Sequence, residues 1–385
     1  MRTVEMEAPK IHEGEINDDE VSPIEQVRLT VPNTDDPTLP VWTFRMWVLG
    51  VLSCVLLSFL NQFFSYRKEP LTITQITVQV ATLPIGRFMA GFGSREFSLN
   101  PGPFNMKEHV LISIFGNAGY AFGDGTAYGV GIVTIIIAFY QRKISLFTGW
   151  LLVLTTQILG YGWAGLLRKY VVEPAEMWWP STLVQISLFR TLHEKEIEDE
   201  DGKRYMSRAK FFLIVLTCSF CWYLFPGYLF QTLQSISWVC WTFPKSVTAQ
   251  QIGSGMNGLG IGAFTLDWAT IASFLSSPLI TPFFAIANIF VGYVSVMYVV
   301  IPICYWGFNV FDAKNFPMYS SRLFTAQGQE YNISAIVNDQ FELDKAQYAK
   351  QGRVHLSIMF SVLTYGLGFA KIASTISHVA LFHGR

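Results

Sequence analysis

The stretch FRMWVLGVLSCVLLSFLNQFF, residues 44–64, decides the fold class of this 385-residue chain. It is an unbroken apolar run, and a helix needs about 20 such residues to cross a bilayer. Arg67, Lys68 and Pro70 end the run. Arg45 lies near its other edge, where we expect the long side chain to reach the lipid interface. The run therefore predicts a transmembrane helix.

The composition of the whole chain agrees with a membrane protein. Hydrophobic residues make up 51% of the sequence and charged residues only 14%, whereas about a quarter of the residues in an average soluble domain are charged. Because lipid does not require a charged protein surface, this deficit argues against a soluble protein. The formal net charge of -1 supplies no basic surface for nucleic acid, so we exclude that partner.

Further apolar runs repeat along the chain and predict a helical bundle. We expect an all-α, polytopic transmembrane bundle of about nine spans, with broken or re-entrant segments in addition. The second run carries polar residues on one face, which indicates packing against protein or a wet cavity. The predicted spans are residues 44–64, 71–92, 128–140, 146–167, 177–189, 211–230, 264–279, 283–306 and 355–382.

The remaining residues predict a polar tail and polar loops. Residues 1–40 form an acidic tail that lacks the basic start and apolar core of a secretory signal, and we expect it to be largely disordered. Residues 41–385 form the transmembrane region. Within that region, the charged run 193–210 and the polar stretch 308–353 predict solvated loops.

One stretch, SLNPGPFNMKEH at residues 98–109, interrupts the helical pattern. Pro101, Gly102 and Pro103 are incompatible with a helix interior, and the apolar run 110–115 that follows is too short to span. The pattern predicts a re-entrant or interrupted element, with an ordinary extramembrane loop as the alternative. Broken helices at membrane depth survive where protein or water satisfies the freed backbone groups, and substrate and ion sites lie at such places.

Three ionisable residues follow this break. Lys107, Glu108 and His109 lead directly into an apolar run. Because charge is costly inside a membrane, such groups are functional candidates. A histidine beside a carboxylate also suits proton uptake near neutral pH, so we predict Glu108 and His109 as a proton relay. A solvated helix start is the alternative interpretation.

A second glycine-rich stretch is GSGMNGLGIG, residues 253–262. It lacks the closing Gly-Lys-Ser/Thr of a phosphate loop and follows no hydrophobic strand, so we do not interpret it as a nucleotide site. We expect a flexible backbone that opens a helix and presents peptide N–H groups to a ligand carboxylate, with Asn257 adding hydrogen bonds. Asp267 would lie about one turn into that helix.

Enzymatic chemistry finds little support in the sequence. Asp124 and Asp267 would form an intramembrane aspartyl protease dyad only if glycine stood where Ala121 stands. Neither a His-Glu-x-x-His motif nor a serine-nucleophile elbow is present, and the six histidines are scattered. The odd number of cysteines, five, cannot form a complete disulfide framework. We therefore predict no enzyme, no metal site and no cofactor.

Several of these segments together resemble the oligopeptide transporter family, specifically its plant and fungal peptide-transporter branch. The asparagine-proline-glycine stretch at 98–109 is similar to the signature of that family, and three other segments match in order along nearly the whole chain. These are the glycine-rich run 253–262 with residues 264–268, residues 22–28 with 34–37 before the first span, and residues 375–384 at the end.

The resemblance implies a multi-pass, proton-coupled importer of short peptides, expected in the plasma membrane. Peptide-like conjugates such as glutathione are substrates of some members. Protons and membrane lipids are then the other partners, with Glu108 and His109 as the proton-coupling residues. The residues expected to hold the substrate's carboxylate and amide groups are Asn100, Pro101, Gly102, Asn105, Lys107, Gly253, Gly255, Asn257 and Gly258.

The chain departs from the family pattern in one respect. Family members are longer and carry a second signature, Lys-Ile-Pro-Pro-Arg, in their later half, which this sequence lacks. We therefore expect the chain to correspond to the N-terminal half of such a transporter. Because transporters are usually built from paired repeats with the substrate between them, we expect poor transport by the chain alone unless it pairs with a complementary half or another copy.

Two alternatives stay open. The family's sister branch carries metal-nicotianamine chelates, and competing uptake assays with peptides and chelates would separate the two substrate classes. In the second alternative, a half-length product does not transport but associates with a full-length carrier. Co-purification without uptake would favour that role.

Overall fold

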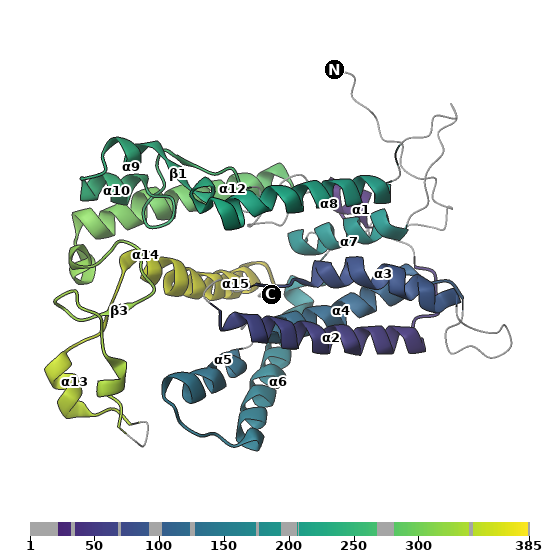
Figure 1. Ribbon diagram of the computed structural model, residues 1–385, viewed down its shortest axis with the longest axis horizontal. Helices are drawn as coiled ribbons and strands as arrows, with labels where there is room; N and C mark the ends of the chain where they lie inside the picture. Colours follow the sequence, from purple (N-terminus) through teal and green to yellow (C-terminus); the bar gives the residue numbers. More distant parts are fainter. Residues whose placement is uncertain are drawn as a thin grey trace. The chain divides into compact units, whose positions relative to one another are not determined.

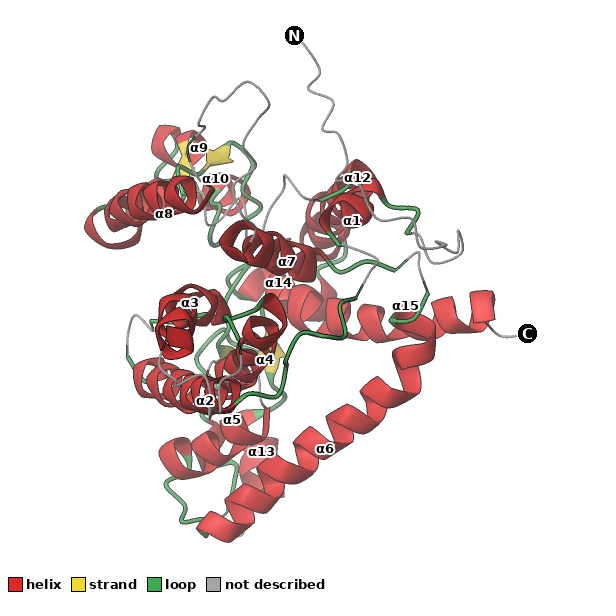
Figure 2. Ribbon diagram, turned by 90° about the vertical axis from the view of Figure 1, so that its right-hand side faces the viewer, coloured by secondary structure: helices red, strands yellow, loops and turns green. Residues whose placement is uncertain are grey.

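The computed structural model describes residues 22–31, 35–67, 71–91, 102–123, 128–174, 177–193, 206, 208–267, 281–338 and 342–383. Helices dominate this part of the chain, and its strands form two short antiparallel pairs (Figure 2). The predicted helical fold class is confirmed. The chain divides into two compact units, Met1–Leu213 and Ile214–Arg385.

The first unit consists of helices, whose starts follow from local sequence. The side chain of Thr43 accepts a hydrogen bond from the Met46 N–H and caps the first long helix, and Ser145 caps another through the Thr148 N–H. The elements are α1 (Glu25–Thr30), α2 (Phe44–Ser65), α3 (Gln75–Gly91), α4 (Met106–Gly123), α5 (Tyr128–Thr134), the π-helical η2 (Ile135–Phe139), α6 (Leu146–Val171) and α7 (Pro180–His193).

Helices α2, α3 and α4 pack side by side and form the core of the first unit (Figure 1). The turn between α2 and α3 is held by Asn61, whose amide donates to the Ile73 carbonyl at 2.9 Å and accepts from the Ile73 N–H at 2.7 Å. Buried apolar side chains fill the space between the three helices: Met46, Leu49, Leu57, Val78, Phe104 and Ile112.

Helix α4 corrects one expectation. The sequence predicted a short apolar run that ends before Gly116, but α4 is continuous from Met106 to Gly123. The glycines do not break it because they face neighbouring helices: a Cβ on Gly116 would lie 3.1 Å from Val78, and one on Gly119 would overlap the backbone of Cys54. The glycines therefore allow close packing of α4 against α2 and α3.

The second unit contains helices, two strand pairs and a compact region between its last two long helices. Strand β1 pairs with β2, and β3 pairs with β4. Helix α8 (Arg208–Leu224) begins before the division between the units. The other elements are η3 (Phe225–Leu229), η4 (Gln231–Gln234), β1 (Ile236–Ser237), α9 (Trp238–Thr242), α10 (Val247–Gly253), β2 (Ala263–Phe264), α12 (Phe283–Val294), η5 (Ser295–Val300), η6 (Ile303–Gly307), η7 (Val310–Asn315), β3 (Leu323–Phe324), η8 (Ile333–Ala335), α13 (Lys345–Gln351), β4 (His355–Leu356), α14 (Ile358–Phe360), η9 (Ser361–Gly366) and α15 (Leu367–His383).

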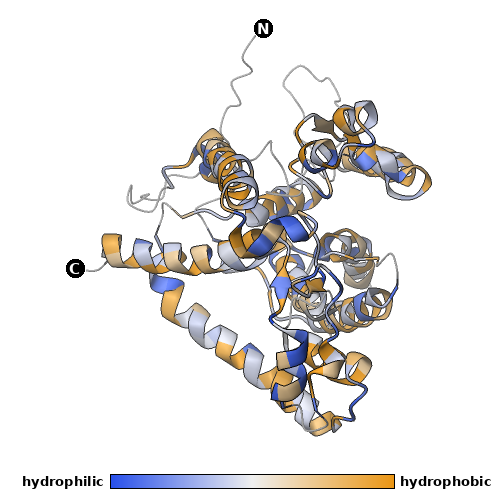
Figure 3. Ribbon diagram, turned by 90° about the vertical axis from the view of Figure 1, so that its left-hand side faces the viewer, coloured by the Kyte–Doolittle hydropathy of each residue, from blue (hydrophilic) through white to orange (hydrophobic). Residues whose placement is uncertain are grey.

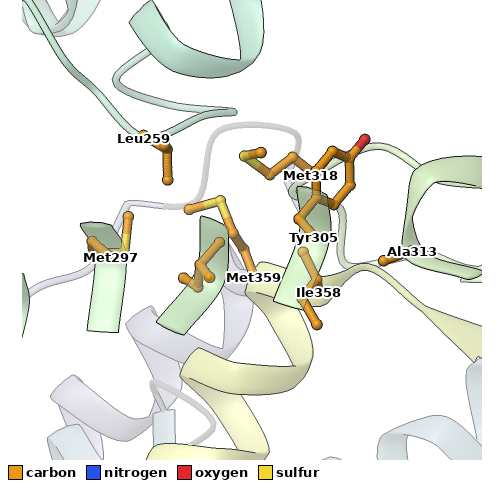
Figure 4. Packing of buried hydrophobic residues seen from close by; sticks show 8 residues of the cluster. Leu259, Met297, Tyr305, Ala313, Met318, Ile358 and Met359 are labelled. Carbon is orange, nitrogen blue, oxygen red and sulfur yellow. The ribbon is translucent and has the colours of Figure 1, made fainter. Parts of the chain in front are cut away.

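The core of the second unit is rich in methionine. Figure 4 shows Met297, Met318 and Met359 in one cluster with Tyr305, and Leu259 of the glycine-rich run belongs to the same cluster. Flexible thioether side chains fill irregular space, which suits a junction between π-helical segments and loops.

Five segments of the described chain are long and apolar enough to cross a membrane, and each matches a predicted span. They are Phe44–Ser65, Leu146–Val171, Lys210–Leu229, Phe283–Gly307 and Ile358–Phe382. Hydrophobic residues follow these helices along their length, including the helix that ends near the C-terminus in Figure 3. On α6 large apolar side chains such as those of Phe147 and Trp163 are exposed, as expected for a surface solvated by lipid.

The other predicted spans have mixed outcomes, so the count of about nine stays a prediction. The span at 71–92 is the 17-residue helix α3, which contains Pro84 and buries the polar side chains of Gln79 and Thr82. These two polar side chains therefore pack against protein, which is one of the two predicted alternatives, whereas Thr77 on the same helix is exposed. The spans at 128–140 and 177–189 are shorter helices, and most of 264–279 lies outside the described residues.

Part of the acidic N-terminal tail is ordered. Residues 1–21 lie outside the described part of the chain, but Glu25–Thr30 form α1 against α7. Arg190 on α7 donates to the backbone carbonyl of Leu29 at 2.7 Å. The polar region at 308–353 also has local structure, with its strand pair and α13.

Replacing Gly119 with alanine tests the close packing of α2 and α4. The new Cβ would lie 2.8 Å from the Cα of Cys54, and such overpacking costs about 1–3 kcal/mol. We expect a lower thermal unfolding midpoint in detergent. The matched control is Gly162→Ala on α6, where nothing lies within 4 Å and alanine is the better helix former. Equal midpoints for the two variants would contradict the packing.

Candidate functional site

A buried ion pair joins α2 to α4. The guanidinium of Arg45 donates to the carboxylate of Glu108, with Nη2 at 2.8 Å from Oε2 and Nε at 3.1 Å from both oxygens. Both side chains are 0% exposed. The predicted position of Arg45 at the lipid interface is therefore wrong, because a carboxylate 63 residues away in the sequence lies within reach inside the bundle.

The same arginine holds the loop before α4. Arg45 Nη1 donates to the Gly102 carbonyl at 3.0 Å, and Nη2 donates to the Pro103 carbonyl at 2.9 Å. Gly102 has a φ of +73°, a left-handed conformation that glycine adopts without steric cost. Of the predicted substrate residues here, Asn100 and Pro101 lie outside the described residues, and Gly102 takes part in this network through its carbonyl.

Asn105 and Glu108 cap α4 reciprocally. The Asn105 side chain accepts from the Glu108 N–H at 3.0 Å, and Glu108 Oε2 accepts from the Asn105 N–H at 3.3 Å. The Asn105 amide also donates to the Pro40 carbonyl at 2.7 Å. This is the geometry of a capping box, and it fixes the start of α4.

Glu108 accepts hydrogen bonds on both carboxylate oxygens. Besides the three bonds from Arg45 and the one from the Asn105 N–H, the Thr43 hydroxyl donates to Oε1. A buried carboxylate is stable only when such donors replace water. The predicted role of Glu108 in proton transfer stays a prediction, and its contacts show a carboxylate that organises α2, the loop and α4.

Lys107 points away from this pair. Its ammonium lies 2.6 Å from the carboxylate of Asp35 and donates to the backbone carbonyl of Asp36. Asp35 is largely exposed, so this ion pair is open to solvent. Exposed pairs contribute little stability, and their partners exchange readily.

His109 lies on the buried side of α4 and contacts a second histidine. Its Nδ1 is 2.8 Å from Nε2 of His193, the last residue of α7, and its Nε2 is 2.8 Å from the Gln79 carbonyl on α3. The rings of Phe104 and Phe189 pack against the histidines. Helices α3, α4 and α7 thus meet at this pair.

The side chain of Gln79 is the unusual group beside the histidines. It is 0% exposed, and neither its Oε1 nor its Nε2 has a hydrogen-bond partner among the described residues. An unsatisfied buried amide costs about 1–3 kcal/mol, so such groups are uncommon and often mark function. Arg87, two turns further along α3, donates to the Leu192 carbonyl at 2.9 Å.

The glycine-rich run in the second unit is a folded loop that leads into a strand. The run does not open directly into a helix as predicted, because it returns after the end of α10 at Gly253 to pair β2 with β1; most of the predicted helix at 264–279 lies outside the described residues. The N–H groups of Leu259 and Ile261 donate to the carbonyls of Gln251 and Ile252, so these donors are used inside the loop. Asp267 therefore lies beyond a strand, not within a helix.

The four predicted substrate residues of this run differ in exposure. Gly255 and Asn257 are exposed at the tip of the loop, whereas Gly253 and Gly258 are buried. A Cβ on Gly258 would overlap the Gln251 carbonyl, so glycine is required there for packing. Asn257 is held by its own N–H, which donates to the Ser254 hydroxyl at 3.1 Å.

Comparison with known proteins decides the family. The family model described as "OPT oligopeptide transporter protein" matches residues 41–385. The chain belongs to the OPT oligopeptide transporter family. It is 71% identical to Oligopeptide transporter 4 of Arabidopsis thaliana over 96% of this chain and 51% of that protein. Identity is 66% to Oligopeptide transporter 2, over 99% of the chain and 52% of the relative, and 58% to Oligopeptide transporter 7, over 94% and 48%.

The OPT chain thus spans about half the length of the curated relatives it matches. No solved structure matches it significantly. Family membership together with the five membrane-length helices makes it an integral, multi-pass membrane protein. Membership in a family of transporters also confirms the prediction that it is not an enzyme.

Sequence reasoning missed three residues of this site in the OPT chain: Arg45, Gln79 and His193. Arg45 was visible as a charge inside an apolar run, which usually signals a buried partner. His193 was assigned to the solvated charged run 193–210, of which it is the first residue. Gln79 was noted only as one member of a polar face, and nothing in the sequence shows that its amide lacks partners.

Replacing Glu108 with glutamine tests the buried ion pair. Removing one partner leaves the Arg45 charge uncompensated, which costs about 3–5 kcal/mol. We expect a large fall in the thermal unfolding midpoint of the chain in detergent. Lys107→Gln is the matched control on the adjacent residue, because its exposed pair contributes at most about 1 kcal/mol.

A double variant distinguishes the cost of an unpaired buried charge from the cost of a change in side-chain volume. Arg45→Met together with Glu108→Leu removes both charges and retains apolar volume, and such replacements of buried pairs are often neutral. We expect the double variant to be more stable than Glu108→Gln. If Glu108→Gln unfolds at the same temperature as Lys107→Gln, the ion pair is not a stabilising element.

Proposed function

We propose that this chain forms part of a proton-coupled carrier of short peptides or peptide-like conjugates such as glutathione. The relatives that match it at 71% and 66% identity are named oligopeptide transporters. The single observation that carries the proposal is the cluster of buried polar groups, Arg45, Glu108, His109 and Gln79, within an apolar helical bundle. Such groups are costly in a membrane protein and are expected where a polar solute or proton passes.

Lys107 is the proposed ligand for the peptide carboxylate. Its present partner, Asp35, is a carboxylate on an exposed segment. An incoming peptide carboxylate would replace one carboxylate with another at little cost, because the exposed pair is weak. The second unit, taken by itself, offers a separate set of proposed contacts: the exposed Gly255 and Asn257 supply a backbone amide and a side-chain amide, and Gly253 and Gly258 shape their loop.

The transport test uses an exchange protein. In it, the region of Arabidopsis thaliana Oligopeptide transporter 4 that this chain matches is replaced by this chain. We expect the exchange protein in proteoliposomes to accumulate a labelled short peptide when an inward proton gradient is imposed. Unlabelled glutathione and a metal-nicotianamine chelate are added as competitors. Preference for the chelate, or no uptake of either substrate, would overturn the peptide proposal.

The Lys107 proposal has its own measurement. A hydrogen bond to a charged group contributes about 1.5–3 kcal/mol, so Lys107→Gln should raise the KM for a free-carboxylate peptide about tenfold or more. The KM for the same peptide with an amidated C-terminus should not change further. Lys143→Gln, on an exposed residue between η2 and α6, is the control. An equal effect on both peptides would exclude Lys107 as the carboxylate ligand.

A further inference from the structure

The hydrogen bonds of His109 fix where its proton lies. A backbone carbonyl only accepts, so His109 Nε2, at 2.8 Å from the Gln79 carbonyl, carries a hydrogen. In the neutral ring Nδ1 is then an acceptor. His193 Nε2, at 2.8 Å from this Nδ1, must therefore be the donor. The neutral pair has one defined arrangement of its hydrogens.

Adding one proton to the pair preserves every one of these bonds. The proton is taken up at Nδ1 of His193, which makes that ring an imidazolium while Nε2 still donates to His109. Transfer of the shared hydrogen across the 2.8 Å contact then moves the positive charge to His109, and His193 becomes the acceptor. One proton thus passes from one ring to the other through an existing hydrogen bond.

A second proton cannot be accommodated at this distance. Two imidazolium rings would place two N–H groups in the same N···N contact, with no lone pair between them. The positive charge of Arg87 on α3 acts on both rings and disfavours each added positive charge, the first as well as the second. The other charged groups near the pair are already engaged: Arg45 with Glu108, Lys107 with Asp35, and Arg190 with the α1 backbone.

The difference in burial between the two histidines indicates the order in which a proton reaches them. His109 is 0% exposed, whereas His193 at the end of α7 is partly exposed. The aromatic rings of Phe104 and Phe189 cover the buried side. A proton from solvent therefore reaches His193 first and the interior of the bundle second.

We propose that His193 completes the proton site, so that His109 and His193 together bind one coupling proton that enters through His193. The coupling role rests on the proposed function of proton-driven transport. The capacity for one shared proton does not, because it follows from the hydrogen-bond geometry alone. The two parts can therefore be tested separately.

Titration of the unaltered chain tests the shared proton. The 385-residue chain is labelled with ¹⁵N-histidine in nanodiscs, and the ring nitrogens are assigned with single His→Gln variants. We expect His109 and His193 to respond together to pH and to take up one proton between them. Two imidazolium rings in the folded chain would overturn the pair. The titration itself is made on the unaltered chain, and the variants serve only to assign the ring nitrogens.

Transport by the exchange protein tests the coupling role. We expect His193→Gln to lose the stimulation of uptake by an inward proton gradient while peptide exchange without a gradient persists. His378→Gln is the control and should keep the stimulation. If His193→Gln behaves like the control, the inference fails and the proposed function stands. If the unaltered exchange protein shows no stimulation, the proposed proton coupling fails, and the coupling role of His193 fails with it.

Discussion

The buried contact between Arg45 and Glu108 is the constraint on which the first unit depends. An unpaired charge inside an apolar bundle is too costly to keep, so each side chain requires the other. Meeting that requirement fixes the start of α2 against the start of α4. The arginine has further donors, and these hold the carbonyls of Gly102 and Pro103. The non-helical loop before α4 is therefore anchored by the same side chain that pairs the helices.

This anchoring explains how the OPT chain tolerates irregular backbone next to apolar helices. Backbone groups freed by Pro103 and Gly102 find donors within the protein, which is the condition for non-helical chain in a membrane protein. Asn105 adds the cap of α4 and a bond to the Pro40 carbonyl. The network is rigid because every member has several partners. It places His109, one residue after Glu108, on the face of α4 that meets α3 and α7.

Two different kinds of polar group result from this arrangement. In the ion pair, the charges of Arg45 and Glu108 compensate each other, and the pair holds α2 to α4. The histidine pair and the Gln79 amide next to it differ from the ion pair: the histidines lie in a single N···N contact of 2.8 Å, and the amide has no partner among the described residues. A group that keeps spare hydrogen-bonding capacity can bind a proton or a solute without first losing an existing partner. The two kinds of group start from adjacent residues of α4, since Glu108 belongs to the ion pair and His109 to the histidine pair. This arrangement is the main feature of the site.

The sequence by itself determined the local features. Apolar length predicted the membrane-spanning helices at 44–64 and 146–167, because spanning depends only on consecutive residues. It also predicted the non-helical loop at Gly102 and the polar, protein-facing side of α3. Only the tertiary structure decided which side chains meet. Arg45 lies 63 residues from Glu108, and His109 lies 84 residues from His193. Such pairs depend on how helices pack, which local patterns do not show. The sequence patterns therefore predicted Arg45 at the lipid interface, His193 in a solvated loop and an interruption within what is the continuous helix α4. The physical reason is that the burial of a charged residue or a glycine depends on its neighbours in space. Those neighbours are distant in the sequence, so a local sequence pattern does not identify them.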